Sequence, residues 1–147
     1  MIGPSARGRM TDHTPMAGES ARAFEGLIAI VDDDVSVRQA LERLLKSVGI
    51  VSESHGSGMD FLESPALHDA DCLLLDLHLP GMSGTEVLGE IRVAASKIPV
   101  VLMTGRHEVD FGKKAMAAGA SAFLRKPFGE EALFDALATA TGKRVAP

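Results

Sequence analysis

Five polar side chains capable of catalytic or metal-binding chemistry follow apolar runs of the sequence. They are Asp32, Asp33, Asp76, Thr104 and Lys126. The clearest case is LLLDLHLPGMSG, in which one aspartate ends a run of leucines and precedes a Pro-Gly turn. An ionised carboxylate at the margin of an apolar core is costly unless a cation or a hydrogen-bond donor pairs with it. Each acid is therefore either a cap of the next element or part of a reaction site.

The chemistry of this set depends on whether its members converge. Clustered carboxylates repel, and each raises the pKa of its neighbours unless a cation offsets the charge. Oxygen ligands suit a hard ion such as Mg²⁺, which keeps water ligands and accepts phosphate oxygens. With a metal, Lys126 and Thr104 around it, Asp76 could attack a phosphoryl group and form an aspartyl phosphate. Asp76 is thus a candidate nucleophile.

The hydrophobic pattern predicts alternating strands and helices that would position these residues. Short apolar runs bounded by polar residues indicate strands, and apolar residues at three- and four-residue intervals indicate helices. The expected strands are 27–31, 50–55, 72–75, 98–103 and 120–125. The expected helices are 35–48, 58–63, 85–93, 109–118 and 130–140. Asp34 is expected to cap the first helix, and Gly49 to end it.

This alternation corresponds to five βα units. Apolar strands that alternate with helices predict a parallel sheet covered on both faces, because right-handed crossovers place helices there. In such sheets, ligands bind beyond the carboxyl ends of the strands, near the point where the strand order reverses. Because all five polar residues follow strands, we expect them to meet at one edge of the sheet.

Size and charge restrict the possible function classes. With 147 residues, of which 46% are hydrophobic, the chain can form one buried core but not two ordinary domains. The net charge of -5 argues against a surface that binds nucleic acid or an anionic membrane. No apolar run is long enough to span a bilayer or resembles a signal peptide, so a cytoplasmic location is expected. The single cysteine, Cys72, is expected to be a buried apolar residue.

Composition also predicts the domain boundaries. Residues 1–25 are rich in Gly, Pro, Ser, Thr and scattered charge without an apolar period, which indicates a flexible tail. We expect one domain over residues 26–142 and a short C-terminal tail over residues 143–147.

Four motifs lie at the strand ends, in the order IVDDD, LLLDLHLPGMSG, VVLMTG and FLRKPF. Each is weak alone, but together they resemble the receiver (CheY-like) domain of two-component response regulators, from Leu27 to Thr141. The MTG and AMAAGA segments look most like the FixJ/NarL-type branch, whose members often carry a helix-turn-helix output domain. The resemblance implies an α/β fold of the doubly wound (βα)5 flavodoxin-like type, with a five-stranded parallel sheet in the order 2-1-3-4-5.

The resemblance implies a metal site and a phosphoacceptor. Asp32 and Asp33 would be the acidic pair that holds Mg²⁺, with Asp76 and the backbone carbonyl of His78 as further ligands. Asp76 would accept a phosphoryl group from a histidine kinase or a phosphotransfer protein.

The resemblance also implies a switch. Thr104 and Lys126 would contact the phosphoryl group, the peptide bond before Pro127 would be cis, and Phe123 would change rotamer together with Thr104. The face formed by the helix near 109–118, the strand at 120–125 and the last helix would then bind a downstream protein or a second copy of the chain. No nucleic acid or membrane contact through this domain is expected.

For two of the site residues, His78 and Phe123, the sequence allows a second interpretation. His78 and Arg106 are expected at the rim of the site, where the corresponding family positions vary and are associated with the lifetime of the acyl phosphate. Metal ligation by the His78 imidazole is disfavoured, because there is no second histidine at helical spacing. Phe123 could instead be an ordinary core residue, since the family often has Tyr there and Phe lacks the hydroxyl.

Three other functions remain as alternatives. A phosphatase of the haloacid dehalogenase type also uses an aspartate nucleophile after a strand, but it requires an acid where this chain has His78. A phosphorylation-independent interaction module is disfavoured because the full set of acids, threonine and lysine is present. The chain could also be a fragment of a DNA-binding transcriptional regulator that lacks its output domain.

Overall fold

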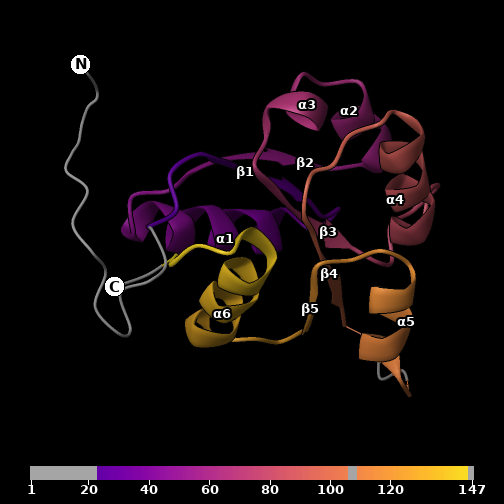
Figure 1. The fold of residues 1–147 in the computed structure, drawn as a ribbon. Helices are drawn as coiled ribbons and strands as arrows, with labels where there is room; N and C mark the ends of the chain where they lie inside the picture. Colours follow the sequence, from indigo (N-terminus) through magenta and orange to yellow (C-terminus); the bar gives the residue numbers. More distant parts are fainter. Residues whose placement is uncertain (1–22, 106–108, 146–147) are drawn as a thin grey trace.

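The described residues form a five-stranded parallel sheet with helices on both faces (Figure 1). The computed structural model describes residues 23–105 and 109–145. The strands are β1 (Leu27–Val31), β2 (Val51–His55), β3 (Cys72–Asp76), β4 (Val100–Thr104) and β5 (Ala122–Arg125). Their order is β2-β1-β3-β4-β5, and every neighbouring pair is parallel. The doubly wound α/β fold and the strand order expected from the sequence are confirmed.

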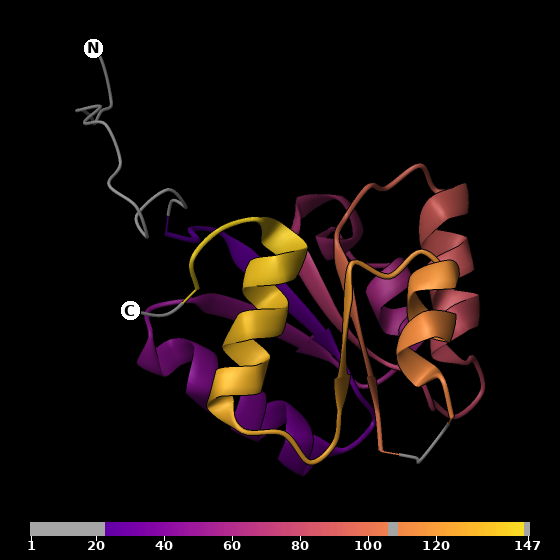
Figure 2. The ribbon, with the colours of Figure 1, turned by 60° about the horizontal axis from the view of Figure 1, so that its bottom comes forward.

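Within the described residues, six helices cover the sheet in two layers, which Figure 2 separates. They are α1 (Val35–Ser47), α2 (Gly58–Leu62), α3 (Ala66–Asp69), α4 (Gly84–Val93), α5 (Phe111–Ala117) and α6 (Glu130–Thr141). Helices α1 and α6 pack on one face, and α2 to α5 pack on the other. None of the helices in the described part of the chain is long and apolar enough to cross a membrane.

The apolar strands divide the core into these two layers. Ala29 and Val31 of β1 pack with the layer of α2 to α5, whereas Ile28 and Ile30 pack with α1 and α6. Alternate residues of a strand point to opposite faces, so a strand covered on both faces must be apolar throughout. This is the physical reason why continuous apolar runs identified the strands.

Two helix starts are capped by side chains at the edge of the sheet where the acids lie. The Asp34 carboxylate accepts hydrogen bonds from the backbone N–H groups of Ser36 (2.8 Å) and Val37 (3.4 Å), so its predicted role as the cap of α1 is confirmed. Ser83 and Glu86 form a reciprocal capping box at the start of α4. These caps set where each helix leaves the site.

The structure differs from the predicted elements at several positions: strand β4, for example, begins at Val100 rather than at residue 98. Three further differences have a local cause. The single-turn helix α3 was not predicted, because four residues are too few to show a helical period. Helix α5 begins at Phe111 rather than at residue 109, since Asp110 has a left-handed backbone with φ of 62°. Strand β5 begins at Ala122 rather than at residue 120, because the Ala120 N–H donates to the Ala115 carbonyl (3.0 Å) and still belongs to the end of α5.

The packed chain extends beyond the boundaries expected from composition. Phe24 and Val145 are buried in the layer of α1 and α6, although both were assigned to tails. The Phe24 N–H donates to the Arg144 carbonyl (2.6 Å), next to a parallel bridge between Ala23 and Arg144. Isolated apolar residues in polar segments have no period, so only the closed fold reveals this contact. The rest of the expected N-terminal tail, residues 1–22, lies outside the described residues.

Candidate functional site

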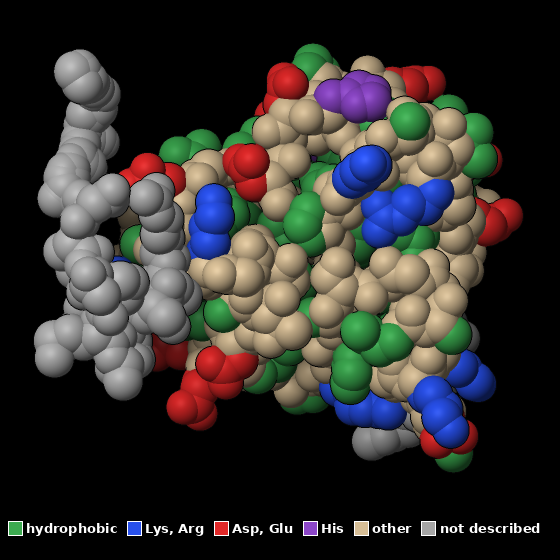
Figure 3. Space-filling view, viewed as in Figure 1, with side chains coloured by type: hydrophobic (Ala, Val, Ile, Leu, Met, Phe, Trp, Pro, Cys, Tyr) green, Lys and Arg blue, Asp and Glu red, His purple; other side chains and the backbone are tan. Residues whose placement is uncertain are grey.

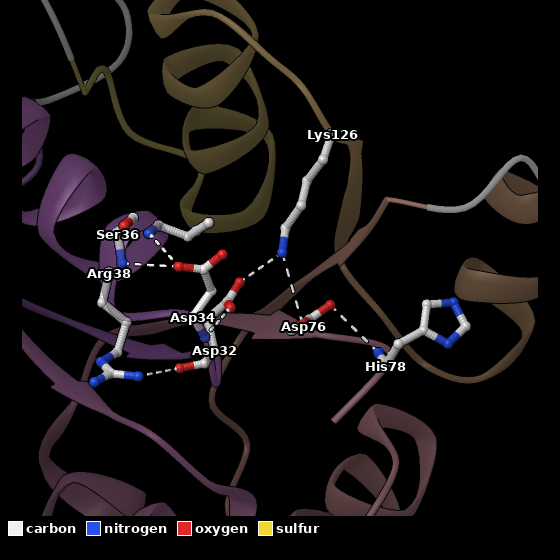
Figure 4. A network of polar contacts seen from close by, with 8 residues as sticks. Asp32, Asp34, Ser36, Arg38, Asp76, His78 and Lys126 are labelled. Carbon is white, nitrogen blue, oxygen red and sulfur yellow. Dashed lines mark hydrogen bonds and ion pairs between the residues drawn. The ribbon is translucent and has the colours of Figure 1, made fainter. Parts of the chain in front are cut away.

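Polar residues from four strands meet at the carboxyl edge of the sheet, and Figure 4 labels those at the ends of β1, β3 and β5. Asp32 follows β1, Asp76 ends β3, Thr104 ends β4 and Lys126 follows β5. The side chains of Asp32, Asp76 and Thr104 are buried, whereas Asp33 is exposed. Because the strands are parallel and in register, their carboxyl ends lie at the same edge of the sheet. Residues that are far apart in sequence therefore lie close together there.

One lysine joins two of the acids. The Lys126 Nζ donates to Asp32 Oδ2 at 2.6 Å and lies 3.6 Å from Asp76 Oδ2. The other Asp32 oxygen, Oδ1, accepts a hydrogen bond from the Asp34 N–H at 2.9 Å. The Arg38 guanidinium donates to the backbone carbonyl of Asp32 at 2.7 Å. These contacts, which Figure 4 shows, hold Asp32 in a fixed orientation beneath the lysine.

The acidic cluster fits a divalent cation. Carboxylate oxygens of Asp32, Asp33 and Asp76 lie within 4.8 Å of one another. Among the described residues, Lys126 pairs with two of the three carboxylates, so the three acids carry more negative charge than this one ammonium offsets. All of the donors are oxygen atoms, one of the acids is open to water, and this combination suits Mg²⁺ rather than a softer metal. The residues present therefore match the expected ion.

The environment of Asp76 raises its pKa above the ordinary value. The main cause is burial, because removing a carboxylate from water disfavours the charged form. The positive charge of Lys126 and a hydrogen bond from the His78 N–H act in the opposite direction, and the negative charges of Asp32 and Asp33 raise the pKa further. A carboxylate held in this way is under-solvated, which favours a reaction or a cation that offsets its charge.

The turn after β3 sets the orientation of Asp76. The Leu77 N–H donates to the Met103 carbonyl (2.8 Å), and the Gly84 N–H donates to the Leu77 carbonyl (2.8 Å). A side chain at Gly84 would lie 2.6 Å from the Asp76 carbonyl oxygen, so only glycine allows this close approach. The His78 N–H then reaches Asp76 Oδ1 at 3.3 Å. In Figure 4 the His78 imidazole points away from the acidic cluster.

The family model of the response regulator receiver domain matches residues 28–138 of the chain. The chain belongs to the response regulator receiver family. Such receiver domains are signalling domains that interact with histidine kinases and output domains. The family and fold suggested by the four sequence motifs are confirmed.

Curated relatives and solved structures agree with this family. The receiver domain is 34% identical to nodulation protein W of Bradyrhizobium diazoefficiens, over 88% of this chain and 57% of the relative. It is 35% identical to the transcriptional regulatory protein FixJ of Azorhizobium caulinodans, over 79% of this chain and 55% of the relative. A solved response regulator receiver protein from Burkholderia phymatum is 37% identical, with a TM-score of 0.72 over 84% of this chain and 99% of that structure.

The chain spans about half the length of the curated relatives named here. The matches are to response regulators, and they give no support to the alternative of a haloacid dehalogenase-type phosphatase.

The last strand of the receiver domain brings two more predicted features to the site. The peptide bond between Lys126 and Pro127 is cis, as expected. The Lys126 N–H donates to the Thr104 carbonyl at 2.7 Å, which links the ends of β4 and β5. Thr104 and Lys126, which were predicted to contact the same phosphoryl group, are therefore adjacent in the structure.

The aromatic residue of the receiver domain lies at its surface. Phe123 is 40% exposed, so the alternative of an ordinary core position is wrong. Its ring meets the buried ring of Phe111 edge to face, with a centroid distance of 5.6 Å. Whether Phe123 changes rotamer remains a prediction. The other rim position, Arg106, lies outside the described residues.

Two residues with a structural part in the site were missed by sequence reasoning. Arg38 supports Asp32 from α1, and nothing in the pattern distinguishes it from other solvated helix residues. Gly84 is different, because the second glycine of PGMSG is a visible signal for a close backbone approach. Glycine in such a turn could have been assigned to the site from the sequence.

Proposed function

We propose that Asp76 is the phosphoacceptor of this receiver domain. An Asp76 oxygen attacks the phosphorus of a phosphohistidine, the P–N bond breaks, and the histidine leaves as the phosphoryl group becomes an aspartyl phosphate. The observation that carries the proposal is the convergence of Asp76 with Asp32, Asp33 and Lys126 at the strand ends. The domain supplies the acceptor and its surroundings and acts as a signalling domain rather than as an enzyme with its own substrate.

The neighbouring residues have distinct parts in this step. Lys126 lies close enough to Asp76 to contact an oxygen of the incoming phosphoryl group, and Thr104 is the hydroxyl at the adjacent strand end. Asp32, Asp33, Asp76 and the backbone carbonyl of His78 would hold Mg²⁺. The ion, when bound, neutralises the negative charge of the phosphoryl oxygens.

The direct test is labelling of the purified protein by acetyl phosphate with Mg²⁺. We expect a mass increase of one phosphoryl group on Asp76, which Asp76→Asn abolishes and EDTA prevents. Asp69→Asn, which changes an exposed acid on α3, serves as the matched control and should label like the wild type. Labelling that persists at another aspartate in Asp76→Asn would overturn the assignment.

An apolar groove beside the site suits the phosphodonor protein. A cavity of about 440 Å³ is lined by Val37, Ala40, Leu41, Leu44, Gly105, Lys126, Pro127 and Phe128. It joins one side of α1 to the loop that carries Lys126, so a helix docked there would lie next to Asp76. Shape and apolar contact in such a groove would orient a phosphohistidine toward the acceptor. We infer that the histidine kinase or phosphotransfer protein binds on this side of α1.

Two neighbouring substitutions on α1 test this docking site. Ala40 is exposed and lines the groove, whereas Gln39 is exposed on the same helix but does not line it. Ala40→Arg should slow transfer from any phosphotransfer protein that labels the wild type, by roughly tenfold or more. Gln39→Arg should have little effect, and both variants should still react normally with acetyl phosphate. Equal loss in both variants would contradict the placement.

The face formed by α5, β5 and α6 is the proposed output surface. Phosphorylation adds charge and acceptor oxygens at Asp76, which draw Lys126 and Thr104 toward the phosphoryl group and shift the equilibrium of this face. Phe123 and Met116 are exposed there and border a cavity of about 490 Å³. Figure 3 shows basic side chains gathered over α5 and acidic ones over the lower end of α6. An apolar patch that is flanked by basic and acidic side chains suits the binding of a protein partner or of a second copy of the chain.

The rim residues are proposed to set the lifetime of the phosphorylated state. His78 lies in the turn directly after Asp76, and Arg106 follows Thr104 closely in sequence. Replacing both with Ala should change the rate at which phosphorylated Asp76 loses its label. An unchanged dephosphorylation rate in this double variant would refute the role.

A further inference from the structure

Three side chains form a stack at the junction of β5 and α5. The Arg125 guanidinium carbon lies 5.3 Å from the centre of the Phe111 ring, and the Phe123 ring meets Phe111 edge to face. Phe111 is buried, whereas Phe123 and Arg125 are exposed, so Phe123 is the exposed aromatic ring of the stack and is part of the output surface. The position of Phe123 therefore decides whether this face presents an aromatic ring.

The Phe123 ring occupies the space that a side chain at position 112 would take. A Cβ atom added to Gly112 would lie 2.5 Å from Cζ of Phe123, 2.7 Å from Cε1 and 3.1 Å from Cε2. Real Cβ contacts are essentially never shorter than 3.0 Å, so the first two distances mean that even an alanine at this position would exclude the observed ring. Gly112 is a helical residue with no need for a special backbone angle, so its lack of a side chain serves the ring rather than the turn.

We propose that Gly112 is the positioning residue for Phe123, and that it sets the balance between the outward ring and its other rotamers. The contact involves the far end of a flexible side chain, so a residue at 112 would displace the ring by rotation rather than break the fold. The residue at position 112 thus determines whether the Phe123 ring is presented on the output surface. The functional part of this inference rests on the proposed role of that surface, whereas the positioning itself does not.

The strand register connects this position to the phosphoacceptor site. Phe123 is paired with Leu102 on β4, and Arg125 is paired with Thr104, two residues farther along each strand. Residues two apart on a strand point to the same face of the sheet. Phe123 therefore lies on the sheet face to which Thr104 also points.

The rotamer is measured by fluorine NMR on protein containing 4-fluorophenylalanine, without phosphate or Mg²⁺. The chain has six phenylalanines, and Phe123→Leu identifies the resonance of Phe123. Gly112→Ala should shift the Phe123 resonance and change its response to a solvent paramagnetic agent. Gly89→Ala is the matched control, because Gly89 is also helical and nothing lies within 4 Å of its added Cβ. An unchanged Phe123 resonance in Gly112→Ala would overturn the proposal.

A double-mutant comparison separates positioning from a general effect of alanine in the helix. In the wild-type background, Gly112→Ala should raise the urea midpoint less than Gly89→Ala, because the ring must move. In a Phe123→Ala background the two substitutions should have similar effects. Equal effects of Gly112→Ala in both backgrounds would show that the ring and position 112 are independent.

Acetyl phosphate labelling of the same proteins keeps the two claims apart. If wild-type protein fails to label at Asp76, the proposed function is wrong while the rotamer result stands. If labelling is normal and the Phe123 resonance of Gly112→Ala is unchanged, the positioning role is wrong while the proposed function stands.

Discussion

The ammonium nitrogen of Lys126 lies 2.6 Å from Oδ2 of Asp32 and 3.6 Å from Oδ2 of Asp76. One cation therefore bridges two buried carboxylates at the ends of different strands. The shorter contact is to Asp32, so the lysine is held mainly by that acid and still lies close to Asp76. The lysine therefore pairs with both acids, and in the proposed function its charge would also act on the incoming phosphoryl group.

Removing this cation should destabilise the fold. Lys126→Met keeps the length of the side chain but leaves Asp32 and Asp76 without their positive partner. Because Lys126 is partly open to water, the loss should be about 2 kcal/mol, below the range for a fully buried pair. Urea unfolding in EDTA measures it, with the exposed Lys97→Met as the control, which should change stability by less than about 0.5 kcal/mol. A loss no larger than the control's would contradict this account of the pair.

Asp76→Asn should stabilise the metal-free protein at neutral pH. Burial raises the folded-state pKa of Asp76 above its ordinary 3.8, so the folded state binds this proton more tightly than the unfolded state does. The corresponding stability is present below pH 3.8 and is lost as pH rises through the folded-state pKa. The advantage of Asn over Asp should therefore shrink as pH falls from 7 toward 4. Urea unfolding across this range in EDTA is the measurement, and a pH-independent difference would count against it.

The Cys72 thiol should be nearly inert in the folded protein. Burial raises its pKa from 9.0 to about 12, so at pH 8 its thiolate fraction is roughly a thousandfold smaller than that of an ordinary thiol. Because it is the only cysteine, colour development with a thiol reagent reports on it alone. We expect slow reaction in native protein and fast reaction in urea. The free energy of unfolding should fall as pH rises above 9, because the thiol ionises first in the unfolded state. The variant Cys72→Ala should lack this fall.

Two glycines of α4 should respond in opposite ways to alanine. A side chain at Gly84 would meet the backbone of Asp76 and Leu77, so Gly84→Ala should cost about 2 kcal/mol and slow phosphorylation by moving Asp76. Nothing lies near Gly89, so Gly89→Ala should gain up to about 1 kcal/mol from helix propensity and leave phosphorylation unchanged. Thermal unfolding and acetyl phosphate labelling of both variants check this pair. Equal stability changes would show that the close approach at Gly84 is relaxed by a backbone shift.

The sequence by itself determined the strands, most helices and the membership of the site. Strands buried on both faces require continuous apolar runs, and local signals such as Asp34 at a helix start act over a few residues. Parallel order then places the carboxyl ends of the strands at one edge, so the sequence alone assigns Asp32, Asp76 and Lys126 to one site.

Only the tertiary structure decided how these residues pair and which side chains are exposed. Lys126 contacts Asp32 more closely than Asp76 because the packing of two strands sets that distance, and no local pattern records it. Phe24 and Val145 are buried because the two ends of the chain meet, and Phe123 lies outward because Gly112 leaves room for its ring. Local periodicity encodes elements, whereas contacts between distant elements depend on how those elements pack.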